Sequence, residues 1–324
     1  MTRLLRWGAP IALLALLASP VSAQRRPARE LQRELQRELQ RVLDSAVTRF
    51  PGKAGVWVKH LATGEEAGVR ADTLFNSASV IKLPVLVLAM QLVDRGTLSL
   101  DERIPVTAAD MRGGSGVLRL FDAGIHPTLR DLLTQMVVTS DNTATDLAIA
   151  KVGGVARVND WLRSNGYAKA MQLTMTTGEL FAKYAPLTAA AGRDEKTISD
   201  PAYWLGAMTP QATGQLLEAM QRCADGTAQG TPLASRARCT DMLRMLRAQL
   251  SGQRRLPHFV SVPVAHKTGD FPPVLANDVG VIFTRSGPVV VSFFANGITG
   301  SYAEAEDAEG RLAERLVAYF DGKR

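Results

Sequence analysis

The sequence predicts an α/β fold of the α+β type, in which an antiparallel sheet is flanked by N- and C-terminal helices and joined to an all-helical lobe. Three observations support this prediction. Alternating apolar residues indicate a β-hairpin at 55–70, apolar β-branched runs return at 260–295, and helical patterns fill the middle of the chain. Because strands occur near both ends, both ends build one body and the middle builds a second lobe.

Residues 1–23 have the pattern of a secretory signal peptide. Arg3 and Arg6 precede an apolar run at 11–18, and Val21-Ser22-Ala23 is a small-x-small cleavage pattern. We therefore expect cleavage near Ala23 and a periplasmic or secreted protein. The apolar run is shorter than the roughly 20 residues that a spanning helix needs, so we expect no stable membrane anchor.

The composition is that of a soluble globular protein, with 46% hydrophobic and 21% charged residues among 324. Removal of the signal leaves 36 basic and 31 acidic side chains, a balance of +5. No basic tract is interleaved with aromatic residues, which argues against nucleic-acid binding. The histidines have no metal-ligand spacing, and there is no Cys-x-x-Cys motif or phosphate-binding loop, so we expect neither a metal nor a cofactor.

The first element after the signal is a helix, because Leu31, Leu35, Leu39 and Leu43 repeat every four residues. We assign 24–44 to an N-terminal helical extension. The other elements are predicted from apolar periodicity and turn residues. They are hairpin strands at 55–61 and 67–70, helices at 83–93, 129–138, 143–152, 155–165 and 210–223, strands at 260–266, 278–284 and 288–295, and a helix at 302–320.

These elements divide the mature chain into two lobes. We place 45–84 and 225–324 in the α/β lobe and 85–224 in the all-helical lobe. A ligand cleft is expected between the two.

The chain contains two cysteines, Cys223 and Cys239, separated by one loop. In an oxidising compartment such a pair can form a disulfide, which we favour. The alternative is two free, buried thiols.

Ser79 and Lys82 form a Ser-x-x-Lys pair at the start of the apolar helix. A spacing of three places both side chains on one face of the first helical turn. A serine hydroxyl becomes a nucleophile when a neighbouring base takes its proton, and a desolvated lysine amine can be that base. Taken alone, the pair is more typical of a solvated helix start.

Two further motifs follow along the chain. Ser140-Asp141-Asn142 lies on a predicted loop between two helices, where it can place a hydroxyl and an amide in the cleft, although helix capping also explains it. Lys267-Thr268-Gly269 follows the strand at 260–266, so we expect it at the strand end, with its cation and hydroxyl facing a substrate carboxylate. Gly269 would leave room for a ligand along the strand edge. The alternative is a plain strand end with a solvated lysine.

Together, these motifs resemble those of class A β-lactamases and related penicillin-recognising serine hydrolases, and their order is a specific signature. The likeness extends to Gly114–Leu118, Val158–Leu162 and Asn277–Ile282 and covers most of residues 45–322. The resemblance implies a β-lactamase/transpeptidase-like fold that opens a β-lactam ring through an acyl-enzyme. The substrate would be a small-molecule β-lactam or a peptidoglycan-like compound, and we expect a monomer.

The resemblance also implies catalytic roles. Ser79 attacks the lactam carbonyl, Lys82 helps to activate it, and Ser140 passes a proton to the leaving nitrogen. The backbone N–H groups of Ser79 and Asp270 form the oxyanion hole.

Substrate-binding roles are implied for the remaining motif residues. Asn142 holds the side-chain amide of the substrate. Lys267 and Thr268 bind its carboxylate, next to Gly269.

One segment departs from the family pattern. Class A β-lactamases carry Glu-x-x-Leu-Asn between the second and third motifs, and its glutamate activates the water that hydrolyses the acyl-enzyme. A gapless alignment places Thr177 at the glutamate and Phe181 at the asparagine, while Glu179 falls two residues late. The loop at 182–200 is long, and its conformation could place Glu179 in the cleft as the base. The alternative is that Glu179 is a solvated carboxylate on the surface of the loop.

Three functions follow from these alternatives. If Glu179 or another group activates water, the protein is a hydrolytic β-lactamase. If no group does, it is a D-alanyl-D-alanine carboxypeptidase or an esterase-like penicillin-binding hydrolase. A non-catalytic envelope binding protein is disfavoured, because Ser79, Lys82, Ser140 and Lys267 are all present.

Overall fold

The computed structural model of the protein describes residues 21–189 and 194–322, without the side chains of 21–33, 35, 195 and 196. Most of the predicted signal peptide lies outside these residues, so cleavage near Ala23 stays a prediction. Within the described part of the chain, no helix combines the length and the apolar character that crossing a membrane requires.

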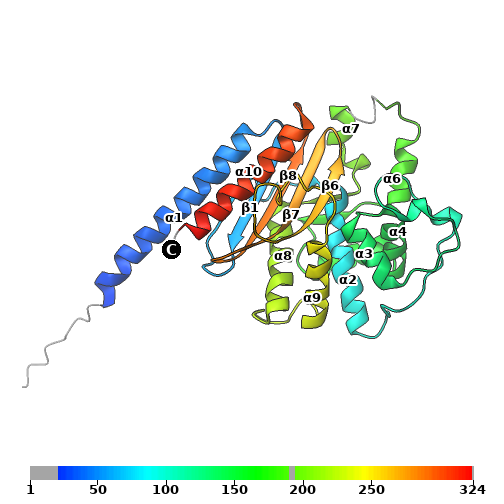
Figure 1. Cartoon of the computed structure of the whole chain (residues 1–324), viewed down its shortest axis with the longest axis horizontal. Helices are drawn as coiled ribbons and strands as arrows, with labels where there is room; N and C mark the ends of the chain where they lie inside the picture. Colours follow the sequence, from blue (N-terminus) through cyan, green and yellow to red (C-terminus); the bar gives the residue numbers. More distant parts are fainter. Residues whose placement is uncertain (1–20, 190–193, 323–324) are drawn as a thin grey trace, which may run out of the picture.

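A five-stranded antiparallel sheet in the order β2-β1-β8-β7-β6 forms the centre of the molecule (Figure 1). β1 (Lys53–His60) and β2 (Glu66–Val69) form the predicted hairpin. β6 (Val264–Phe271), β7 (Leu275–Thr284) and β8 (Gly287–Asn296) come from the other end of the chain. Because β1 pairs with β8, the two ends of the chain build one sheet, which confirms the predicted fold class.

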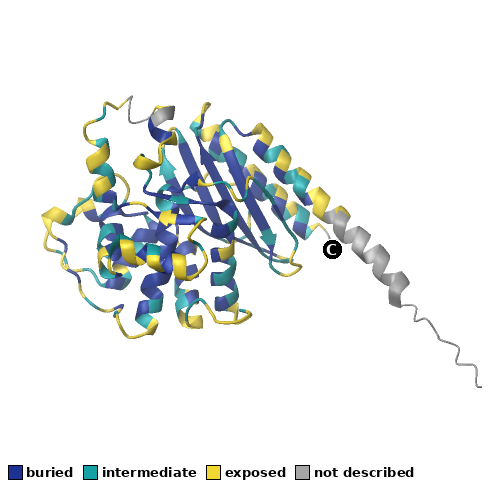
Figure 2. Cartoon of the chain, turned by 180° about the vertical axis from the view of Figure 1, so that it is seen from behind, coloured by how far each residue is buried: buried dark blue, intermediate teal, exposed yellow. Residues whose placement is uncertain are grey.

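Helices cover both faces of this sheet. α1 (Val21–Arg49) and α10 (Tyr302–Asp321) lie on one face, and α8 (Pro210–Asp225) and α9 (Arg236–Arg247) lie on the other. Side chains alternate along each strand, so successive residues of β1 pack in separate cores on the two faces. Figure 2 shows that the strands are consequently buried along nearly their whole length.

The second lobe surrounds α2 (Lys82–Asp94), a helix that is apolar on all sides. Its residues from Lys82 to Met90 are all buried, as expected for a central helix. The other helices of this region are α3 (Leu129–Val138), α4 (Asn142–Lys151), α5 (Gly154–Ser164), α6 (Thr177–Tyr184) and α7 (Glu195–Ser199), with short 3-10 helices η1 (Ala78–Ile81), η2 (Ala108–Asp110), η3 (Leu118–Leu120) and η5 (Pro201–Tyr203).

A small sheet in the order β3-β5-β4 adds strands to the predicted all-helical region. Its strands are β3 (Phe75–Asn76), β5 (Gly206–Met208) and β4 (Met171–Leu173), each of two or three residues. Such short segments carry too few residues for a periodic pattern to be visible in the sequence. The lobe boundaries at residues 84 and 225 stay a prediction.

Strand β6 differs from the sequence prediction. The predicted strand at 260–266 ends before Lys267, whereas β6 begins at Val264 and contains the Lys267–Gly269 motif in its middle. Pro263 has no N–H to donate, which explains the later start. Gly269 does not end the strand, because it pairs in regular register with β7. A Cβ at Gly269 would lie 2.4 Å from the carbonyl oxygen of Ser77, so glycine lets the segment before the nucleophile pack on β6.

The predicted disulfide is confirmed. Cys223 near the end of α8 is bonded to Cys239 in α9, and their Cα atoms are 5.9 Å apart. Both residues are buried. The bond therefore ties together the two helices that cover one face of the central sheet.

Loss of this disulfide is expected to lower the free energy of unfolding by about 3 kcal/mol, because a cross-link over a sequence separation of 16 residues restricts the unfolded chain. Urea unfolding of a Cys223→Ala/Cys239→Ala double variant measures this loss, and the reduced wild type is the matched control. A double variant as stable as the oxidised wild type would contradict the expectation.

Candidate active site

The predicted nucleophile lies in the wall of a cavity of about 720 Å³. Ser79 belongs to η1, which leads directly into α2. The same cavity is lined by Ser140 and Asn142 from the helical lobe and by Asp270 from β6. The structure therefore brings segments far apart in the sequence to one site, as the three motifs predict.

Lys82 is buried beneath this cavity, with 1% of its surface exposed. Its Nζ donates hydrogen bonds to the carbonyl oxygen of Ser140 at 2.7 Å, to Ser140 Oγ at 3.2 Å and to Asn142 Oδ1 at 3.0 Å. Burial, and then the nearby charge of Lys267, hold the pKa of Lys82 well below its ordinary value. The lowered pKa makes it easier for Lys82 to lose a proton, while the three hydrogen bonds use all three N–H groups of its ammonium form.

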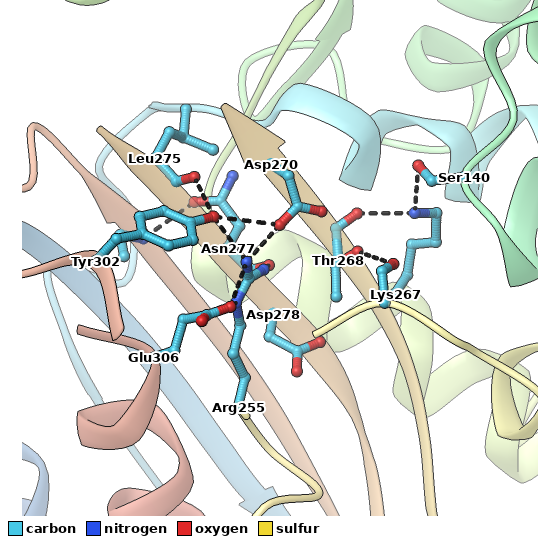
Figure 3. A network of polar contacts seen from close by, with 12 residues as sticks. Ser140, Arg255, Lys267, Thr268, Asp270, Leu275, Asn277, Asp278, Tyr302 and Glu306 are labelled. Atoms are coloured by element: carbon cyan, nitrogen blue, oxygen red, sulfur yellow. Dashed lines mark hydrogen bonds and ion pairs between the residues drawn. The ribbon is translucent and has the colours of Figure 1, made fainter. Parts of the chain in front are cut away.

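Lys267 reaches the same serine from β6, as Figure 3 shows. Its Nζ donates to Ser140 Oγ at 3.0 Å and to the carbonyl oxygen of Thr268 at 2.8 Å. Burial lowers the pKa of Lys267 to about 8, although Asp270 and Asp278 act in the opposite direction. Near neutral pH, Lys267 is therefore mainly a cation.

Ser140 connects the two lysines. Its Oγ accepts from both amines, which uses the two lone pairs of the hydroxyl and leaves its proton free to be donated. Its backbone has a φ of 55°, in the left-handed region that few residues other than glycine adopt. Its carbonyl oxygen also accepts from Ser115 Oγ at 2.8 Å, which helps to hold this conformation.

The two residues after Ser140 have different tasks. Asp141 is the N-cap of α4 and accepts from the amides of Ala144 and Leu118, each at 2.8 Å, so the capping explanation holds for this residue. Asn142 lines the cavity, and its Nδ2 donates to the carbonyl oxygen of Gly113 at 3.0 Å. Its amide is thus held in place in the cavity wall that also contains Ser79.

The third motif presents polar groups along the edge strand. Thr268 Oγ1 lies 2.9 Å from Ser251 Oγ, and Gly269 pairs with β7. Asp270 follows in the cavity wall, where the resemblance places an oxyanion-hole amide. Lys267, Thr268 and Gly269 therefore lie in sequence along β6, but all three are buried and none is among the residues of the cavity wall.

A buried arginine supports this strand from behind, as shown in Figure 3. Arg255, 1% exposed, forms an ion pair with Asp270 and donates to the Tyr302 hydroxyl at 2.9 Å and to Glu306 at 3.1 Å. Although burial opposes it, this ion pair keeps the pKa of Asp270 below its usual value. Sequence reasoning missed Arg255, Tyr302 and Glu306, because no spacing pattern links them to the motifs.

The structure does not bring Glu179 to the site. Its side chain is exposed and absent from the cavity wall. Its carboxylate accepts from the amide and the hydroxyl of Thr176, at 2.7 and 2.9 Å, in a capping box at the start of α6. These hydrogen bonds lower the pKa of Glu179. The long loop has not turned Glu179 inward, so its expected role as the base needs correction: it is a helix-capping residue.

Thr177, which aligns with the family's glutamate, does lie in the cavity wall and is 1% exposed. Its Oγ1 donates to Asp146 Oδ1 at 2.8 Å. Asp146 projects from α4 and also pairs with Arg112, whose Nε lies 2.8 Å from Oδ2. The alignment identified the position of Thr177, but sequence reasoning missed Asp146, which follows Asn142 by one helical turn.

The far end of the cavity is apolar. Its wall includes Leu180, Phe181, Tyr184, Tyr203 and Phe271. The Tyr184 ring lies 5.4 Å from the rings of both Tyr203 and Phe271, measured between centroids. This end can therefore accommodate an apolar part of a substrate.

Metal-ligating side chains are not gathered here. Within residues 21–189 and 194–322, no group of three or more His, Cys, Asp or Glu side chains is arranged to hold a metal ion.

Comparison with known proteins identifies the family. The model of the β-lactamase enzyme family matches residues 34–320. β-Lactamase L2 of Stenotrophomonas maltophilia is 29% identical over 278 residues, 82% of each chain. A β-lactamase structure from Sphaerobacter thermophilus DSM 20745 has a TM-score of 0.71 at 29% identity, covering 86% of this chain and 96% of that one.

PBP-A, in a mutant form that is an acyl-enzyme complex with penicillin G, shares the fold with a TM-score of 0.70 at 19% identity, covering 89% of this chain and 97% of its own. The family model spans most of the sequence, Ser79, Ser140 and Asn142 line one cavity, and Lys267 of the third motif reaches Ser140. The chain therefore belongs to the β-lactamase enzyme family.

Proposed function

We propose that this protein is a serine hydrolase of the class A type, which opens a β-lactam ring through an acyl-enzyme on Ser79. The convergence of Lys82 and Lys267 on Ser140, in the cavity that contains Ser79, is the observation that carries this proposal. A solvated helix start or a plain strand end would not bury either lysine.

Acylation of Ser79 then requires three proton transfers, which involve Lys82 and Ser140. Neutral Lys82 takes the proton of Ser79 as Oγ bonds to the lactam carbon. The carbon–nitrogen bond breaks, and Ser140 gives its proton to the departing nitrogen. Lys82 returns the proton to Ser140 through their hydrogen bond, so that both groups recover their starting states.

Substrate binding uses the edge of β6. Charged Lys267, with the Thr268 hydroxyl, attracts the substrate carboxylate, and the amides of Ser79 and Asp270 stabilise the developing oxyanion. Asn142 holds the side-chain amide of the substrate.

We further propose that deacylation is slow. The cavity wall has Thr177 where a class A enzyme has its glutamate, and the nearby Glu179 caps a helix instead. Loss of a general base typically slows a step by about 10² to 10⁴-fold, or roughly 3 to 5 kcal/mol of barrier. The acyl-enzyme should therefore accumulate.

The same observation supports a second candidate, a D-alanyl-D-alanine carboxypeptidase or esterase-like hydrolase. Such an enzyme acylates on the same serine but is inhibited by β-lactams. A protein that only binds envelope components is not favoured, since it would not need two buried lysines at one serine. For either enzyme we propose export to the periplasm or beyond, action on small molecules, and a monomeric state.

Incubation with penicillin G is expected to add one penicillin mass to the protein, because Ser79 acylates faster than the ester is hydrolysed. Intact-mass spectrometry over time measures formation and loss of the adduct. Ser79→Ala should give no adduct, whereas Ser164→Ala, which removes an exposed hydroxyl of α5, should behave as the wild type.

Absence of an adduct together with absence of hydrolysis would refute the Ser79 nucleophile. An adduct that clears within seconds would instead refute slow deacylation. A D-alanyl-D-alanine peptide distinguishes the two candidates, since release of D-alanine favours the carboxypeptidase.

The second-order rate of acylation is expected to depend on pH with two limbs. The rate rises as Lys82 loses its proton at a lowered pKa, and it falls above about pH 8 as Lys267 loses its charge. Stopped-flow acylation by a chromogenic cephalosporin measures both limbs. Lys267→Arg keeps a permanent cation, so its rate should not fall above pH 8. A wild-type rate that keeps rising through pH 9 would contradict this assignment.

A further inference from the structure

Thr177, in the cavity wall, forms a hydrogen-bonded pair with a carboxylate. It lines the same cavity as Ser79 and is almost fully buried. Its Oγ1 lies 2.8 Å from Asp146 Oδ1 and 3.3 Å from the carbonyl oxygen of Asn142. Since both neighbours are acceptors, the Thr177 hydroxyl donates its proton to them and keeps lone pairs that can accept from another donor.

Asp146 is held firmly in this arrangement. Its Oδ1 also accepts from the amide of Thr177 at 2.7 Å, and its Oδ2 accepts from the amide of Gly178 at 2.9 Å. Arg112 supplies the fourth donor, at 2.8 Å. The carboxylate therefore fixes both the start of α6 and the direction of the Thr177 hydroxyl.

We propose that Thr177 is a catalytic residue for hydrolysis of the acyl-enzyme, and that it passes a proton from the attacking water to Asp146. This inference rests on the proposed function, because it needs an ester on Ser79. In class A enzymes the carboxylate that accepts the proton lies on the loop. Here the carboxylate is Asp146 on α4, and the Thr177 hydroxyl lies between it and the water.

Hydrolysis of the ester begins with attack by water and ends with free Ser79. The water oxygen bonds to the acyl carbon, one water proton moves to Thr177 Oγ1, and the Thr177 proton moves to Asp146 Oδ1. The bond between the acyl carbon and Ser79 Oγ then breaks. The proton returns from Asp146 through Thr177 to Ser79 Oγ, so ester and water become carboxylic acid and free serine.

The same geometry explains why this route is slow. The proton must cross two hydrogen bonds, from water to Thr177 and from Thr177 to Asp146, whereas a carboxylate that faces the water takes it in one transfer. The relay therefore supplies a residual turnover.

Valine and serine substitutions test the relay separately from the fold. Thr177→Val keeps the shape of the side chain and removes the hydroxyl, whereas Thr177→Ser keeps the hydroxyl. Thr176→Val is the matched control, because Thr176 caps the same helix end but is not among the residues of the cavity wall. Intact-mass spectrometry with penicillin G gives the acylation rate and the adduct lifetime of each variant.

We expect Thr177→Val to lengthen the adduct lifetime by about 10²-fold, at the low end for general acid–base catalysis, with an unchanged acylation rate. Thr177→Ser should restore the lifetime to within a few-fold of wild type, and Thr176→Val should leave it unchanged. An unchanged lifetime in Thr177→Val overturns the inference, as does an equal lengthening in Thr176→Val, which would indicate loosening of α6. If no protein forms an adduct, the proposed function fails and the inference fails with it.

Discussion

The site depends on one electrostatic constraint: two lysine side chains are buried beside a single hydroxyl. Removing an ammonium group from water costs several kcal/mol unless other charges compensate, and two like charges at one serine add repulsion. The pair is tolerated because Lys82 loses its proton easily and because Asp270 and Asp278 stabilise the charge of Lys267. In the proposed mechanism one lysine acts as a base and the other as a cation, and both are buried at the same serine.

The carboxylates that stabilise the charge of Lys267 need a positive charge of their own, further from the cavity. Asp270 needs a cation of its own, and Arg255 supplies it while also binding Glu306 and Tyr302 of the C-terminal helix. Glu309, one turn further along that helix, is buried, and burial holds its pKa well above its ordinary value. The last helix of the chain thus takes part in the charge balance of the active site.

Much of the fold, and the convergence of motif residues at Ser140, could be predicted from the sequence, because both depend on local signals. The hairpin, the helix at 129–138, the disulfide and the three motifs each have a recognisable spacing. The Arg255 network could not be predicted, since its members are separated by up to 51 residues and meet only through the packing of α10 on the sheet. The capping role of Glu179 could have been predicted from the sequence, because Thr176-x-x-Glu179 is a capping-box pattern. A capping role competes directly with a catalytic role.

At the start of α6, a carboxylate can serve either the stability of the fold or the hydrolysis of an acyl-enzyme. A carboxylate close to the cavity can either stay available to water or anchor the chain through hydrogen bonds. Asp146 has taken the anchoring role, since two backbone amides and Arg112 converge on it, and Glu179 has taken the capping role beside it. Both carboxylates stabilise the start of α6, and neither is among the residues of the cavity wall that contains Ser79. The groups that we propose for acylation and those that we propose for deacylation therefore lie in different parts of the structure.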